Sequence, residues 1–250
     1  MTLNCLTMVE TGGSIFIALA LVVMLLALLP VCLLYIRKVA DSATLNVLKI
    51  LCLFVIGQYL LLIFIQPGLP ALQTACKLAQ FTLVFYLFNL LMTSARGKDL
   101  MRMVLVSFLS VIITIYALKG FTAYADMLTI IQAGILTVLA IAILLQLINN
   151  RHIVLAGEPA FWIAGGLLCY NGMVVLMEAM AGSQSNLSQQ IQQEKTLIIT
   201  TADILRMVFF IVAASVAGKK DNNSDNNKDT EIQPMPPFLS TRVNRRTIKY

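Results

Sequence analysis

Charged residues are scarce in this sequence, and their scarcity excludes an ordinary soluble domain. Only 12% of the 250 residues are charged and 59% are hydrophobic, whereas a soluble domain carries about 25% charged residues. Nearly all the apolar residues fall in runs that could cross a hydrocarbon core, which needs about 20 helical residues. The composition therefore predicts a chain whose surroundings are mostly lipid.

Residues that commonly carry catalysis are also rare. The chain has one histidine, His152, which excludes bis-histidine haem ligation and a zinc site of the metalloprotease kind. No apolar run contains a central lysine, so a retinal Schiff base is excluded. A nucleotide-binding glycine loop and a G-x-S-x-G motif are absent as well. We therefore expect no catalytic residue, no metal site, no cofactor and no enzymatic activity.

Seven long apolar runs predict an all-α membrane protein with a seven-helix bundle. Helix is the expected conformation, because backbone polar groups inside a bilayer must be satisfied within the segment. The loops between the runs are too short to hold a folded domain, so residues 1–218 form one transmembrane domain. The predicted spans are 14–36, 45–65, 71–94, 101–118, 124–148, 159–181 and 196–217.

Lysine and arginine are distributed unequally between the two sides of this bundle. Fourteen of the 18 lie on one side and Arg206 lies within the last span, which leaves Lys77, Lys119 and Lys195 on the side of the N-terminus. Cytoplasmic loops carry the excess of basic residues. The distribution therefore predicts an outside N-terminus and a cytoplasmic C-terminus. Basic residues at the ends of apolar runs are typical of membrane orientation and not of nucleic-acid binding.

The sequence becomes polar and low in complexity after Gly218. Residues 219–250 could not bury a core, so we predict a disordered cytoplasmic tail. The end of the tail is basic, and a basic segment near a membrane can contact anionic lipid. The alternative is a solvated tail whose charge only fixes the topology. The candidate lipid-contacting residues are Arg242, Arg245, Arg246 and Lys249.

Several polar residues lie within the predicted spans, where they are expensive and usually face protein or water. Asp203 and Arg206 are three residues apart on one helix and can pair. The pair is either a structural latch or the floor of a polar cavity that opens outward. Amide side chains between membrane helices often only pack, so both readings stay open. The other candidate members of such a cluster are Gln58, Gln80, Gln132, Asn171 and Glu178.

Two of the five cysteines, Cys5 and Cys76, are expected near the outer surface, where a disulfide can persist. A bond between them would tie the N-terminal segment to the start of the third span. The alternative is that both are free, since cysteine is a common small apolar residue in helices.

The segment 157–172, GEPAFWIAGGLLCYNG, carries a P-x-F-W-I start followed by a glycine and a tyrosine. In this pattern the chain resembles the sixth span of a group of small bacterial membrane proteins with about seven helices. The resemblance implies a bacterial cytoplasmic (inner) membrane and no particular activity. The residues that carry it are Pro159, Phe161, Trp162, Ile163, Gly166 and Tyr170.

These observations predict three functions in descending order. The first is a non-enzymatic sensing or accessory module, whose short loops and lack of an output domain require a separate protein partner in the membrane or the cytoplasm. The second is a small-solute transporter, in which spans one to three and five to seven would form two halves joined by the fourth. The third is a structural membrane subunit whose polar residues only pack.

Overall fold

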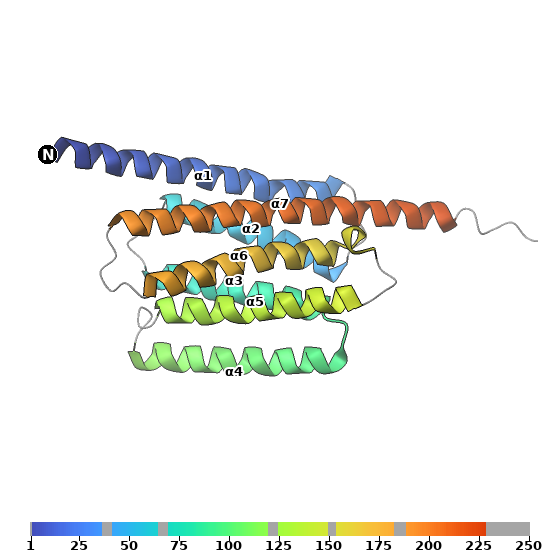
Figure 1. Cartoon of the computed structure of the whole chain (residues 1–250). Coiled ribbons are helices and arrows are strands. Elements are labelled where there is room, and N and C mark those ends of the chain that lie inside the picture. The colour runs from blue at the N-terminus through green and yellow to red at the C-terminus, as the bar shows by residue number, and fades with distance from the viewer. Residues whose placement is uncertain are drawn as a thin grey trace, which may run out of the picture.

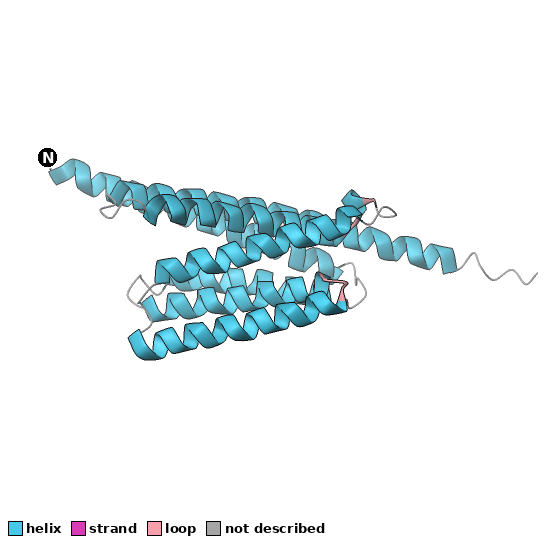
Figure 2. Cartoon of the chain, turned by 60° about the horizontal axis from the view of Figure 1, so that its bottom comes forward, coloured by secondary structure: helices cyan, strands magenta, loops and turns pink. Residues whose placement is uncertain are grey.

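A computed structural model describes residues 2–36, 42–64, 70–119, 125–149, 154–182 and 189–228. Throughout this part of the chain the secondary structure is helical apart from short turns, and it contains no strand (Figure 2). Seven of the helices are long and apolar enough to cross a membrane. The predicted fold class, an all-helical multi-pass membrane protein, is confirmed in this respect.

The seven long helices follow the predicted spans closely, and a short 3-10 helix, η1, precedes the sixth. Successive long helices run in opposite directions (Figure 1). Their bounds are α1 Thr2–Ile36, α2 Ala43–Phe64, α3 Pro70–Leu91, α4 Ala95–Lys119, α5 Ala125–Asn149, η1 Leu155–Gly157, α6 Pro159–Gly182 and α7 Gln189–Lys228.

The helix α4 begins at Ala95, earlier than the predicted Met101, because a serine caps it. The hydroxyl of Ser94 accepts a hydrogen bond from the backbone N–H of Gly97 at 3.4 Å. The carbonyl of the same serine accepts from the N–H of Lys98 at 3.0 Å. A side chain that satisfies the free N–H groups of a first turn allows a helix to start in polar sequence. Hydropathy alone placed the start at the first apolar residue.

The helix α7 is longer than its apolar run at both ends. It continues to Lys228, so residues 219–228 of the predicted disordered tail are helical. Polar composition predicts that a segment buries no core, but it does not forbid helix, and no proline occurs between the start of α7 at Gln189 and Pro234. The remaining tail, with Arg242, Arg245, Arg246 and Lys249, lies outside the described residues.

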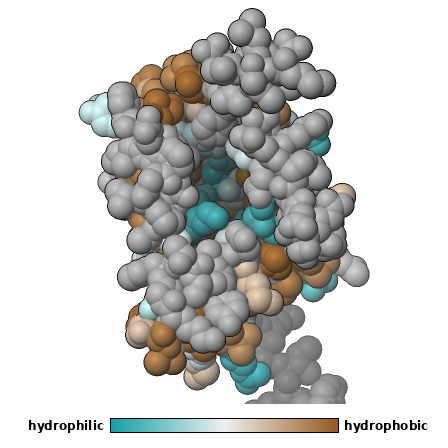
Figure 3. All heavy atoms as spheres, turned by 90° about the vertical axis from the view of Figure 1, so that its left-hand side faces the viewer, coloured by the Kyte–Doolittle hydropathy of each residue, from teal (hydrophilic) through white to brown (hydrophobic). Residues whose placement is uncertain are grey.

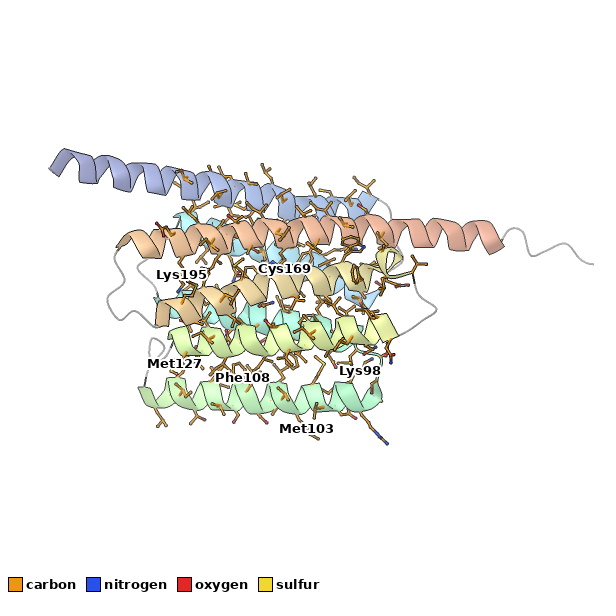
Figure 4. All side chains as sticks on the ribbon, viewed as in Figure 1. Lys98, Met103, Phe108, Met127, Cys169 and Lys195 are labelled. Atoms are coloured by element: carbon orange, nitrogen blue, oxygen red, sulfur yellow. The ribbon has the colours of Figure 1, made fainter. Side chains whose placement is uncertain are left out.

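Six of the helices form a ring, and α4 lies outside it. Each of α1, α2, α3, α5, α6 and α7 packs on the next in that order, and α7 closes the ring against α1. The helix α4 packs mainly on α3, at one edge of the molecule (Figure 1). Phe108 of α4 points into the bundle, where its ring lies 5.0 Å from that of Phe81, whereas Met103 points away (Figure 4).

The outer surface of the helices is apolar, and so is the core. Large apolar side chains such as Leu25, Val106 and Val138 are each about two-thirds exposed. Exposed apolar area on this scale is unfavourable in water and is normal for helices that face lipid. Small buried residues, among them Ala20 and Ala27 on α1 and Ala213 on α7, accompany the close packing of α1 on α7.

The contact between α6 and α7 is made close by glycine. A Cβ atom added at Gly166 would lie 2.7 Å from the Cβ of Phe209 and 3.3 Å from the carbonyl oxygen of Arg206. Trp162 packs on Phe209, with ring centroids 5.8 Å apart, and its indole N–H donates to the carbonyl of Ala156 at 3.0 Å. The glycine and tryptophan of the P-x-F-W-I pattern therefore fix α6 against α7.

The predicted disulfide between Cys5 and Cys76 involves a side chain, that of Cys5, which lies outside the described residues. Cys76 is a free cysteine on α3. The start of α1 extends beyond the other helices (Figure 1).

Candidate functional site

A cavity lined by both polar and apolar side chains lies inside the six-helix ring. Its volume is about 320 Å³, and residues of α2, α3, α6 and α7 line it. Seen from the end at which α1 begins, the molecule is hollowed and hydrophilic side chains lie in the hollow (Figure 3). We call this end of the bundle, at which α1, α3, α5 and α7 begin, the cavity end. Its polar lining includes Gln58, Lys77, Gln80, Thr200 and Asp203.

A second, smaller cavity of about 80 Å³ adjoins the first between α3, α5, α6 and α7. The two cavities share Lys77, Gln80 and Tyr170. Among the described residues, those that line the smaller cavity include two cationic side chains and no carboxylate. Its further polar residues are Thr129, Gln132, Asn171 and Arg206.

Asp203 and Arg206 form the predicted ion pair between adjacent turns of α7. Both side chains are almost completely buried, with 4% and 1% of the residue exposed. The second carboxylate oxygen of Asp203 accepts a hydrogen bond from the hydroxyl of Tyr59 at 2.8 Å. This bond joins α2 to α7, and a neutral hydroxyl that donates to a buried carboxylate helps to replace the water it has lost.

Aromatic rings surround the guanidinium of Arg206. Its carbon lies 4.1 Å from the centroid of the Tyr170 ring and 6.0 Å from that of Phe210. A cation over an aromatic face is stabilised by the ring quadrupole, by about 2 kcal/mol when water is excluded. Asp203 is the ion-pair partner of this guanidinium. Within the described part of the chain, the nitrogens of Arg206 have no hydrogen-bond acceptor beyond that ion pair.

Glu178 lies apart from this group and serves a different contact. Its carboxylate accepts a hydrogen bond from the ammonium of Lys195 at 2.6 Å. Lys195 projects from the start of α7 into the space beside α6 (Figure 4). The pair ties the end of α6 to the start of α7 at the cavity end, and neither residue is among the described residues that line the two cavities.

The structure brings together six of the seven predicted cluster residues. Gln58 lines only the larger cavity and Gln132 only the smaller one, while Gln80 lines both. Asp203 and Arg206 sit one on each side. Asn171 lines the smaller cavity, and its amide also donates to the carbonyl of Leu167 at 2.7 Å. Glu178 is the residue that does not join the cluster.

Three important residues were missed by the sequence analysis. Tyr59 and Tyr170 hold the two charges in place, yet tyrosine is too common in membrane helices to be singled out by its type. Lys77 was assigned to a loop by the charge count but lies in the second turn of α3, on both cavities. Its ammonium donates to the hydroxyl of Thr129 at 3.4 Å. Lys77 lies within the predicted span 71–94, and this position could have identified it as a polar residue inside the membrane.

The described polar residues of the two cavities are mostly hydrogen-bonding side chains. No group of three or more His, Cys, Asp or Glu side chains suited to a metal ion occurs in the described ranges. The cavities offer amides, hydroxyls, two cations and one paired carboxylate. No family model, no curated protein and no solved structure matches this chain.

Proposed function

We propose that the chain is a non-enzymatic sensing module that binds a small solute in the larger cavity and signals through a separate partner. The observation that carries this proposal is a cavity with both polar and apolar lining residues and with part of its wall on α7. A volume of about 320 Å³ is at the lower end of the range for small-molecule sites. The solute is therefore small.

The helix α7 provides the physical connection from solute to partner. Asp203 and Thr200 place it on the cavity wall, and it then packs on α1 and α6 and runs on to Lys228 at the opposite end of the bundle. A ligand shifts an equilibrium between two conformations only if it interacts differently with each. A solute that contacts the Asp203–Arg206 pair supplies such an interaction. Both residues lie on α7, so any movement of α7 changes the distance between the pair and the solute.

We place the N-terminus and the cavity outside and the C-terminus in the cytoplasm. The unequal distribution of lysine and arginine supports this orientation. The P-x-F-W-I pattern of α6 supports a bacterial cytoplasmic membrane. With this orientation the solute enters from outside, and the end of α7 faces cytoplasmic partners.

One observation favours a small-solute transporter as the second candidate. The helix α4 lies outside a ring formed by α1–α3 and α5–α7, which is the arrangement expected for two three-helix halves and a connector. Against it, all seven described helices are unbroken at the cavities, whereas transport sites are commonly formed by discontinuous helices. We therefore rank transport below sensing.

The test uses the free thiol of Cys76, which lines the larger cavity. In membranes with a chain whose other cysteines are replaced, benzyl methanethiosulfonate would attach a ring inside the cavity. Partners are then cross-linked, co-purified in mild detergent and quantified by mass spectrometry. The control chain carries only Cys169, which is exposed on the outer face of α6.

Sensing predicts a stoichiometric partner whose recovery changes when Cys76 is modified and stays constant when Cys169 is modified. A partner indifferent to both modifications would support the structural subunit. A protein recovered alone, with uptake of radiolabelled solutes in reconstituted vesicles that modification of Cys76 blocks, would support the transporter. Either of the last two results overturns the sensing proposal.

A further inference from the structure

The smaller cavity has a charge imbalance that the proposed sensing function does not explain. Lys77 and Arg206 line it, and among its described lining residues there is no carboxylate. Among the described lining residues of the two cavities the one acidic side chain is Asp203, which lines the larger cavity and is already engaged by Arg206 and by the hydroxyl of Tyr59. The lining therefore carries two cations against one carboxylate, with the side chain of Arg206 buried and that of Lys77 exposed.

Arg206 is the second reason to expect a ligand here. It is 1% exposed and is one of the residues that line the smaller cavity, and beyond its ion pair with Asp203 its nitrogens have no hydrogen-bond partner among the described residues. A buried polar group without a hydrogen-bond partner is costly, and more so when it is charged. The guanidinium carries five donors, in a planar arrangement that suits a carboxylate.

The neighbouring groups complete an anion site. The amides of Gln132 and Gln80 and the ammonium of Lys77 lie on the same cavity, and each can donate a hydrogen bond. A volume of about 80 Å³ is several times that needed for one water molecule, so a carboxylate group fits. The adjoining larger cavity has apolar lining as well, from Leu61 and Ile199, which suits a short hydrocarbon chain.

We propose that the solute is a small organic monocarboxylate whose carboxylate occupies the smaller cavity against Arg206, Lys77 and Gln132. This inference rests on the proposed function, because it names the chemical class of the solute that the sensing module binds. The carboxylate pairs with the two cations and accepts hydrogen bonds from those donors of Arg206 that have no acceptor among the described residues.

The test compares three probes of similar size and different charge on the full-length protein in lipid nanodiscs. They are sodium butyrate, butyramide and butylammonium chloride, with sodium chloride at the same ionic strength as the salt control. Binding raises the thermal unfolding midpoint, and the rise with concentration gives an apparent Kd. We expect butyrate to raise the midpoint in a saturable way and the other three to leave it within error of the buffer value.

Two glutamines provide a matched pair of variants that avoids removing a buried charge. Gln132→Leu removes an amide from the smaller cavity, and Gln58→Leu removes one from the larger cavity only. A hydrogen bond to a charged group is strong enough that its loss weakens binding by about tenfold or more. We expect the Kd for butyrate to rise by about that factor in Gln132→Leu and to change less than twofold in Gln58→Leu.

Four results would overturn the inference: saturable binding of butylammonium or butyramide as strong as that of butyrate, an equal effect of sodium chloride, no butyrate binding at all, or equal losses in the two variants. The first of these would leave a solute site in place with a different ligand class. Binding of butyrate together with a partner indifferent to the modification of Cys76 would instead refute sensing and keep the carboxylate site. The two proposals therefore fail separately.

Discussion

At the scale of single residues, the buried charges depend on what surrounds them. Asp203 and Arg206 are paired within one helix, and each is held by a tyrosine from another helix, Tyr59 on α2 and Tyr170 on α6. Removing one member of a buried pair costs about 3 to 5 kcal/mol, because it leaves an uncompensated charge. Replacing either charge would therefore perturb folding and function together. The tyrosines offer a milder change.

We expect Tyr59→Phe to lower the free energy of unfolding by about 1 to 3 kcal/mol. The change removes only the hydroxyl, and the Asp203 oxygen that accepts its hydrogen bond stays buried. The matched control is Tyr86→Phe on α3, because Tyr86 is about half exposed on the outer surface of the bundle. Unfolding in mixed detergents is the measurement. Equal effects of the two substitutions would show that the bond between Tyr59 and Asp203 contributes nothing to stability.

The polar residues of the site show how far sequence reasoning reaches at this scale. Asp203, Arg206 and the amides were found because such groups are expensive in a membrane, and six of the seven line the cavities. Burying Glu178 in a membrane is as unfavourable as burying Asp203, but Glu178 is paired with Lys195. Lys195 lies just before the predicted seventh span, so the sequence did not indicate this pair. Residue type therefore identifies which side chains need a partner, whereas the identity of that partner depends on how the helices pack.

At the scale of helices, hydropathy located all seven spans because the length of an apolar run is fixed by the thickness of the bilayer. It could not show that α4 lies outside the ring, because an apolar face looks the same in sequence whether it meets lipid or protein. The start of α4 at Ala95 depended on capping by Ser94. The extension of α7 depended on the absence of a helix breaker. Hydropathy measures neither feature.

The packing of α6 on α7 depends on Gly166, and we expect Gly166→Ala to destabilise the bundle by about 1 to 3 kcal/mol. The new methyl group would lie 2.7 Å from the Cβ of Phe209, and this atom is fixed to the backbone, so the helices must move apart. Thermal unfolding in nanodiscs is the measurement. The control is Gly172→Ala, six residues further along α6. Apart from the neighbouring residues and backbone of α6 itself, no atom lies within 4 Å of the added Cβ.

We expect Gly172→Ala to be neutral or stabilising by up to about 1 kcal/mol, since alanine is the better helix former. The pair of variants separates helix propensity from helix contact. If both substitutions stabilise the protein, the close approach at Gly166 does not limit the packing of α6 on α7. A loss of stability confined to Gly166→Ala would show that the close contact between α6 and α7 at this glycine stabilises the bundle.

At the scale of the whole molecule, the cavity is open toward one end of the bundle (Figure 3). The orientation of the chain in the membrane therefore decides from which side a reagent reaches the cavity. Placing the cavity end outside predicts that a charged, membrane-impermeant thiol reagent added to intact cells labels a chain whose only cysteine is Cys76. Cys76 lines the larger cavity on α3, near the cavity end. The control chain keeps only Cys169, which is exposed on α6, a helix long and apolar enough to cross the membrane.

The control thiol is expected to stay unlabelled from either side, because a charged reagent does not enter hydrocarbon. The same reagent applied to inside-out vesicles should leave Cys76 unlabelled, since the ring beyond the cavities is filled by apolar side chains such as Phe85, Phe88 and Leu51. Labelling of Cys76 only in inside-out vesicles would reverse the orientation, and the solute would then be an intracellular one. Labelling from both sides would mean that the apolar half of the ring opens, which a transporter requires and a sensor does not.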